Sequence, residues 1–175
     1  MATAVRRKPS IGLEFLKKIH QILCTESMPR SAKAQPKPPT GQYRKDNPLH
    51  RLYFHEIVQP EKISYQMRKL VQWVTSDEAK KMHVIRRAAV AHHKLISIFP
   101  WPRHSGKVAR LLMNSILLRE GYVPSVVHAI ERQRYYEVLR QTPTELTKLV
   151  AESLNRTLDS AGKFVDQIEA IRAAS

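Results

Sequence analysis

The chain has 175 residues, a formal net charge of +15 and a single cysteine. One cysteine excludes an internal disulfide framework and a zinc site built from several thiolates of one chain. Hydrophobic residues make up 42% of the sequence, which excludes a wholly disordered chain, and no apolar stretch is long enough for a bilayer span. We therefore expect one soluble, cytoplasmic domain without membrane insertion; the basic N-terminus makes the mitochondrial matrix an alternative.

The N-terminal third of the sequence predicts one helix and one long loop. Apolar residues recur at helical spacing over residues 10–24, and we assign its apolar face to Ile11, Phe15, Ile19 and Ile22. Residues 25–50 are rich in proline and nearly lack apolar side chains, which predicts a long loop. An alternating pattern over residues 51–58 then predicts an extended segment.

The remaining residues predict helices and no further strand. The expected helices cover residues 60–74, 77–98, 107–121, 130–140 and 142–170. Pro100 and Pro102 end the second of these, because proline disfavours helix at and before its own position. Gly121 suits the C-terminal cap of the third, and Thr142 with Glu145 forms a capping-box signal for the last. The pattern predicts an all-α domain over residues 10–170, between a basic tail at 1–9 and a short tail at 171–175.

The segment that joins two of these helices carries a known sequence pattern. Residues 87–110 read RAAVAHHKLISIFPWPRHSGKVAR, and residues 111–122 read LLMNSILLREGY. This resembles the Fic domain, the family of AMP-transferring (AMPylating) proteins, which has the motif H-x-F-x-[D/E]-G-N-G-R-x-x-R between an "AHH…I" helix and an "RLLMN-x-LLLR-x-GY" helix. Residues 134–139, RYYEVL, are similar to the next family helix, and residues 41–44, GQYR, to its "PGEFR" loop.

The resemblance implies a Fic-fold helical bundle with a short β-hairpin flap. The flap would occupy residues 51–60, and its Tyr53, Phe54 and His55 would dock the substrate or partner. The motif would occupy residues 99–110.

The motif departs from the family pattern where the pattern carries chemistry. Aligned on Gly106 and Arg110, Phe99 stands at the family's catalytic histidine and Arg103 at its metal-binding acid. Phenylalanine has no basic nitrogen, so general-base help is absent there, and an arginine repels a metal cation instead of ligating it. We therefore expect no metal site, no Mg²⁺ and no ordinary AMP transfer. His104 and Ser105 replace the family's Gly-Asn pair.

The phosphate-binding part of the motif is better retained. Gly106 and Arg110 are kept, and Lys107 replaces an arginine. Together with Ser105 they are the candidate residues for residual nucleotide or phosphate binding at a helix N-terminus. No dedicated cofactor is expected.

Two functional hypotheses follow from these observations. The first is a pseudoenzyme that binds a partner protein or a polyanion such as RNA, the ribosome or DNA, since a pI near 10 is typical of nucleic-acid binding. The alternative is a diverged transferase in which His104 acts as base and Arg103, Lys107 and Arg110 clamp a phosphate. The same charge also fits a merely solvated surface, and a homodimer is compatible with either hypothesis.

Overall fold

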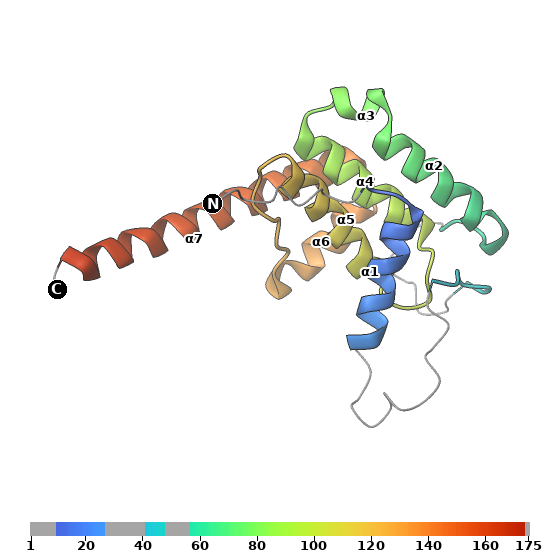
Figure 1. Ribbon diagram of the computed structural model, residues 1–175, viewed down its shortest axis with the longest axis horizontal. Coiled ribbons are helices and arrows are strands. Elements are labelled where there is room, and N and C mark those ends of the chain that lie inside the picture. Colours follow the sequence, from blue (N-terminus) through green and yellow to red (C-terminus); the bar gives the residue numbers. More distant parts are fainter. Residues whose placement is uncertain (1–9, 27–40, 48–56, 174–175) are drawn as a thin grey trace, which may run out of the picture.

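The computed structural model describes residues 10–26, 41–47 and 57–173. Within these ranges every regular element is a helix, which agrees with the all-α prediction. The helices form a bundle from which the last one projects (Figure 1). No helix in the described ranges combines the length and the apolarity that crossing a bilayer requires.

Only the end of the predicted flap falls within the described residues. Tyr53, Phe54 and His55 lie outside them, so the docking role assigned to these side chains stays a prediction. Residues 57–59 are irregular, and a 3₁₀ turn, η2 (Pro60–Lys62), follows at once. No strand is present in the described part of the flap.

The face predicted for the first helix, α1 (Leu13–Glu26), is confirmed in part, since Ile11 just before it is buried and Phe15 and Ile19 pack against the core. Leu16 and His20 are its most buried side chains, whereas Ile22 is 45% exposed. α1 packs against α5 (Ser105–Arg119). Since Leu16 and His20 are four residues apart, they lie on the same face of α1, and a polar side chain occupies a core position there.

The predicted helix over residues 77–98 consists of two helices. These are α3 (Asp77–Lys81) and α4 (Val84–Ile98), separated by Met82 and His83, whose backbone ψ angles of 149° and 135° are incompatible with helix. The start of α3 is set by Ser76, whose Oγ accepts a hydrogen bond from the Ala79 backbone N–H at 3.2 Å. The break separates α3 from α4, which packs against α2 (Ile63–Thr75).

α4 and α5 form the centre of the bundle. Ala88, Ala89 and Ala91 of α4 are fully buried, and such small side chains allow neighbouring helices to approach closely. α4 packs against both α5 and α7 (Pro143–Ala173). The cap predicted at Gly121 is confirmed: its φ is +83°, and Tyr122 N–H donates to the Leu117 carbonyl at 3.0 Å, as in a Schellman motif.

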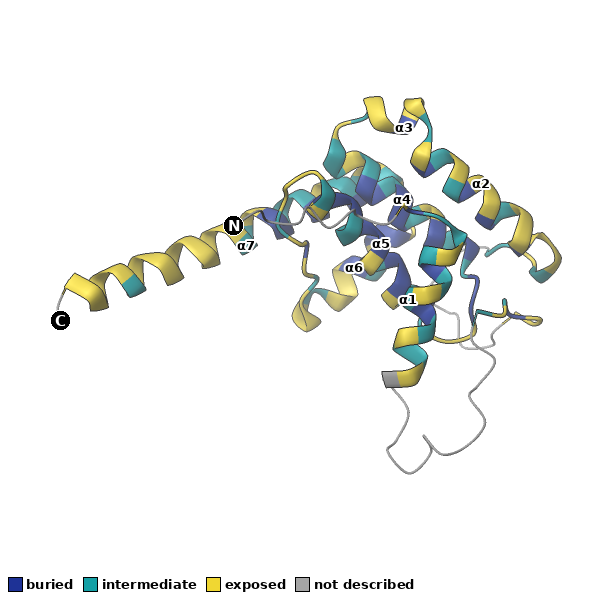
Figure 2. Cartoon of the chain, in the orientation of Figure 1, coloured by how far each residue is buried: buried dark blue, intermediate teal, exposed yellow. Residues whose placement is uncertain are grey.

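A short turn and a short helix complete the bundle before α7. η3 (Ala129–Glu131) leads into α6 (Arg132–Leu139), and α6 packs against α7. Leu146, Leu149 and Leu154 hold the first half of α7 in the core. Arg156 still pairs with Glu131 at 2.8 Å, and beyond Thr157 α7 projects from the bundle and is largely exposed to solvent (Figure 2).

Candidate functional site

The motif loop, residues 99–104, connects α4 to α5 and begins and ends in left-handed backbone conformations. Phe99 has a φ of +46° and His104 a φ of +65°. Side chains other than glycine adopt this region at a cost of roughly 1–3 kcal/mol, so surrounding contacts must hold the loop. His104 stands where the motif has a glycine, and the left-handed turn is retained although its usual residue is not.

Arg44 is the main contact that holds the loop. Its side chain is only 4% exposed, and its Nε donates to the Phe99 carbonyl at 2.8 Å. Its guanidinium also donates to the Val58 carbonyl and to Asn47 Oδ1, while its backbone N–H donates to the Pro100 carbonyl. One buried cation thereby ties the segment before the predicted flap and the end of that flap to the start of the motif loop.

Trp101 anchors the middle of the loop in the core. It is fully buried, and the His20 ring of α1 stacks on it at 4.6 Å between centroids and 9° between planes. Ser105 Oγ accepts from the Trp101 N–H at 2.9 Å and donates to the Trp101 carbonyl at 2.8 Å. Ser105 is also fully buried, so its hydroxyl closes the loop and is not exposed to a ligand.

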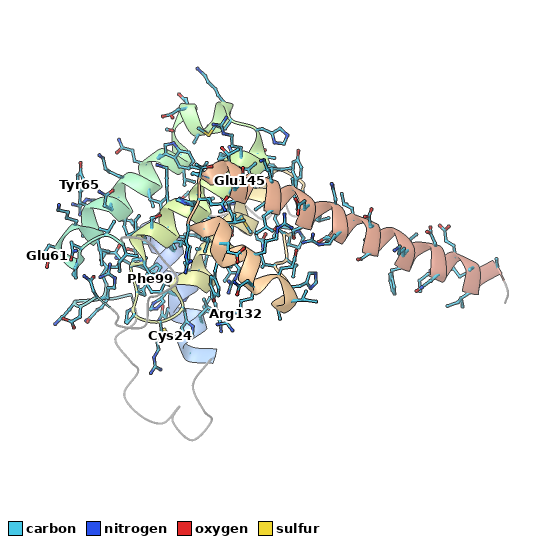
Figure 3. All side chains as sticks on the ribbon, turned by 180° about the vertical axis from the view of Figure 1, so that it is seen from behind. Cys24, Glu61, Tyr65, Phe99, Arg132 and Glu145 are labelled. Atoms are coloured by element: carbon cyan, nitrogen blue, oxygen red, sulfur yellow. The ribbon has the colours of Figure 1, made fainter. Side chains whose placement is uncertain are left out.

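The titratable groups around the loop favour neutral imidazoles. Burial is the main cause that lowers the pKa values of His20 and His104, and the charges of Lys107 and Arg103 lower that of His104 further. His20 Nε2 lies 3.5 Å from Cys24 Sγ, and burial raises the pKa of that thiol. A neutral His104 retains a lone pair that can accept a proton, whereas a protonated Cys24 is a weak nucleophile. Figure 3 labels Phe99 on the loop and Cys24 on α1.

Acidic metal ligands are absent from this part of the molecule. Residues 79–119, which include α4, the loop and α5, contain nine Lys or Arg and no Asp or Glu. Over the whole described part of the chain, no group of three or more His, Cys, Asp or Glu side chains is arranged to hold a metal ion. The residues present therefore do not fit the Mg²⁺ that the resemblance implies.

Arg110 lies at a hollow of about 370 Å³ between α5 and α6. The lining residues are Arg110, Val127, His128, Ala129, Arg132, Tyr135 and Tyr136. The guanidinium of Arg110 lies 5.9 Å from the centre of the Tyr135 ring, and that of Arg132 lies 5.5 Å from the Tyr136 ring. Cations stacked on aromatic rings are restrained in orientation, and these two could pair with the phosphates of an anionic ligand.

A buried hydrogen bond fixes Tyr135, one of the residues that line this hollow. Tyr135 Oη lies 2.9 Å from His92 Nε2, and His92 is fully buried in α4. Burial raises the pKa of Tyr135 to about 12 and lowers that of His92 to about 4. The His92–Tyr135 pair is therefore neutral at physiological pH, so it does not neutralise the positive charge of Arg110 in the hollow.

The hollow beside α6 includes only one of the four predicted phosphate-binding residues. Arg110 lines the hollow, but Lys107 is exposed and is not among the lining residues, and Ser105 is buried in the loop. Gly106 is half-buried at the start of α5. A larger hollow of about 600 Å³ lies between α2 and α4, and no residue of the motif contributes to it.

Two important residues were missed by the sequence analysis. Arg44 was part of a segment that matches a family loop, yet nothing in that match indicates that its side chain would hold the motif loop. His20 had a clearer signal, because it lies four residues after Leu16 on the same side of an amphipathic helix. A histidine at an apolar position points to a buried polar contact.

Comparison with known sequences identifies one family. The Fic/DOC family model matches residues 10–117. The protein adenylyltransferase Fic of Nematostella vectensis is 30% identical over 163 residues, which cover 91% of this chain and 36% of that protein. The protein of the same name from Culex quinquefasciatus is 30% identical over 165 residues, 90% of this chain and 30% of its own. The chain thus spans about a third of the length of these curated relatives.

Solved structures agree on the fold. Fic-1 from C. elegans superposes with a TM-score of 0.68 at 24% identity, covering 95% of this chain and 46% of that one. A Fic family protein from Desulfovibrio desulfuricans superposes with a TM-score of 0.62 at 18% identity, covering 88% and 49%.

Proposed function

This chain belongs to the Fic/DOC family, and we propose that it is a Fic domain that has lost adenylyl transfer and acts by binding a partner. One observation carries the proposal. Phe99 stands where the family motif has its base, and residues 79–119, which include α4, the loop and α5, contain no carboxylate for a metal ion. Base and metal each contribute several kcal/mol to phosphoryl-group chemistry, so their combined loss removes most of the rate enhancement.

The loop is retained as a structural element in this proposal. Arg44, Trp101 and Ser105 hold it through buried contacts that do not depend on the lost residues. The ordered loop and the start of α5 expose Arg103 and Lys107 to solvent. Residues 79–119, around them in the sequence, contain no acid. A negatively charged partner such as RNA, or the phosphate-rich surface of a ribosome, complements this surface.

A transfer assay tests the loss of catalysis. Incubation with ATP labelled in the α-phosphate, Mg²⁺ and acceptor proteins should label nothing above the background of the Arg110→Ala variant. Label that appears with the wild-type chain and disappears with Arg110→Ala would contradict the proposal. The assay is unambiguous because Arg110 is partly exposed at a hollow, so its removal should leave the fold intact.

A binding assay tests the proposed partner class. Wild-type protein should retain labelled RNA with an affinity that falls as salt rises, because cations that pair with phosphates release counterions. The double variant Arg103→Ala/Lys107→Ala should reduce the steepness of the salt dependence by about 2. Arg68→Ala/Lys69→Ala on α2 is the matched control. An equal loss of RNA affinity in both variants would show that binding depends on the total charge and not on the motif loop.

The second candidate function is binding of a nucleotide or phosphate, as expected for a diverged transferase. It is favoured by the hollow beside Arg110, where Arg132 and two tyrosine rings offer cationic and aromatic contacts. ATP at millimolar concentration, with or without Mg²⁺, should then raise the melting temperature of the wild type but not that of Arg110→Ala. No stabilisation in either condition would eliminate this candidate, and transfer without Mg²⁺ that is lost in His104→Gln would support it over the pseudoenzyme.

A further inference from the structure

The second half of α7 projects from the bundle and exposes an apolar face. Leu158 is 54% exposed, Phe164 63% and Val165 51%, while the first half of the same helix is buried in the core. Figures 1 and 2 show that the end of α7 projects from the other helices and is almost entirely exposed. Arg156 still contacts the body, since it pairs with Glu131 at 2.8 Å. Most helical stability in proteins comes from packing of an apolar face, so a partner that covers this face would stabilise the segment.

The apolar residues of the projecting segment follow the spacing of a helix–helix seam. Leu158, Ala161, Val165 and Ile168 are separated by three, four and three residues, the alternation of core positions a and d in a heptad repeat. Phe164 widens this stripe on one side. The spacing continues from Leu154, the last residue that the bundle buries, so the outer stripe extends the inner one beyond the body.

The projecting segment differs from the rest of the chain in charge. Residues 155–173 contain the cations Arg156, Lys163 and Arg172 and the acids Asp159, Asp166 and Glu169, a net charge of zero. The whole chain carries +15, so the remaining residues contribute all of the excess. Two copies of the body would repel each other, whereas two copies of this segment would not.

We propose that the apolar stripe of residues 158–168 pairs with the same stripe of a second copy of this chain, in antiparallel orientation. In this arrangement Leu158 faces Ile168 of the second copy and Ala161 faces its Val165, so one two-fold axis relates the helices. This inference does not depend on the proposed function, because it uses no residue of the motif loop.

Charge and geometry favour the antiparallel orientation over the parallel one. The segment of 19 residues is about 28 Å long. Antiparallel pairing places the two basic bodies at opposite ends of this length, while parallel pairing brings them side by side. Antiparallel pairing also places the positive end of each helix dipole beside the negative end of the other, which is favourable.

Oligomeric state tests the interface. Sedimentation equilibrium of the full chain should give a reversible dimer, and Leu158→Glu/Val165→Glu should raise the dissociation constant at least about 100-fold, because it buries charge in the seam. The matched control Ser160→Glu/Gln167→Glu adds the same two charges to the opposite side of the helix and should leave the constant within about threefold. A wild-type chain that stays monomeric at 200 µM would overturn the proposal, and so would equal effects of the two double variants.

Disulfide trapping tests the orientation. In a Cys24→Ser background, Leu158→Cys and Ile168→Cys proteins are oxidised separately and as a mixture. Antiparallel pairing predicts that the mixture cross-links at least about tenfold faster than either protein alone, since only unlike positions then meet within disulfide distance. Faster cross-linking of Leu158→Cys with itself would show parallel pairing and overturn the proposed orientation. Far-ultraviolet circular dichroism of each variant checks that α7 is still helical.

Discussion

Helices α4 and α5 keep the apolar faces that the family pattern specifies, whereas the loop between them has lost four of the eight residues that the motif specifies. The loop nevertheless keeps a left-handed turn at His104 and a fully buried aromatic ring at Trp101. The comparison indicates that the loop backbone is held by packing and by Arg44, and that the residues needed for chemistry are not needed to shape it. A motif loop that lacks these residues can therefore remain an ordered surface.

Replacing Trp101 tests whether the loop is part of the core. Trp101→Ala should lower the free energy of unfolding by about 4 kcal/mol, because it removes a fully buried ring and leaves His20 without its stacking partner. Urea denaturation measures the loss. Trp73→Ala is the control, since Trp73 is only half-buried, and its loss should be clearly smaller. Equal losses would mean that the loop is no more integrated than the surface of α2.

Replacing Arg44 tests how the loop is held. Arg44→Met should cost about 3 kcal/mol, because it leaves the carbonyls of Phe99 and Val58 without their buried donor. Arg44→Lys should recover only part of this loss, since an ammonium group cannot reproduce a planar fork of donors. Arg68→Met, at an exposed position of α2, serves as the control. A loss in Arg44→Met no larger than in this control would refute the role given to the guanidinium.

Lowering the pH should reduce the stability of the protein, because His92 is buried as a neutral imidazole. Folding lowers the pKa of His92 to about 4, so the unfolded chain binds more protons between pH 6.5 and 4, and stability falls as the pH falls through that window. The free energy of unfolding should drop by about 2 kcal/mol from pH 7.5 to pH 5. His20 and His104 act in the same direction.

The variant His92→Gln isolates the contribution of the buried imidazole. It should flatten this pH dependence while still offering a hydrogen bond to Tyr135. Denaturation at five or more pH values provides the measurement. An unchanged slope in the variant would assign the effect to other groups.

The smallest effect expected concerns ligand binding beside the loop. Arg110→Ala should weaken the binding of inorganic pyrophosphate about tenfold, because Arg110 lines the hollow between α5 and α6. Lys107→Ala should weaken it less than threefold, since Lys107 is exposed and lies outside that lining. Isothermal titration at low salt compares the two. A larger effect of Lys107→Ala would place the anion at the start of α5 instead of in the hollow.

Much of the fold follows from local sequence signals. Apolar periodicity, prolines 100 and 102 and the Gly121 cap locate the helices on either side of the motif, because each acts over a few neighbouring residues. The break between α3 and α4 was not predicted, since Met82 and His83 carry no helix-breaking side chain. The break is seen only in the tertiary structure, in which α3 and α4 both contact α2.

The composition and the motif by themselves determined the family resemblance, the basic charge, and the replacement of the motif's histidine and acid by Phe99 and Arg103, because these depend only on which residues stand at which spacing. Tertiary structure alone decided the roles of Arg44, His20 and Ser105, the place of Arg110 at a hollow, and the exposure of the outer half of α7. Burial and partners are set by segments far apart in the chain, such as Arg44 and Phe99. No local pattern contains the distance between them.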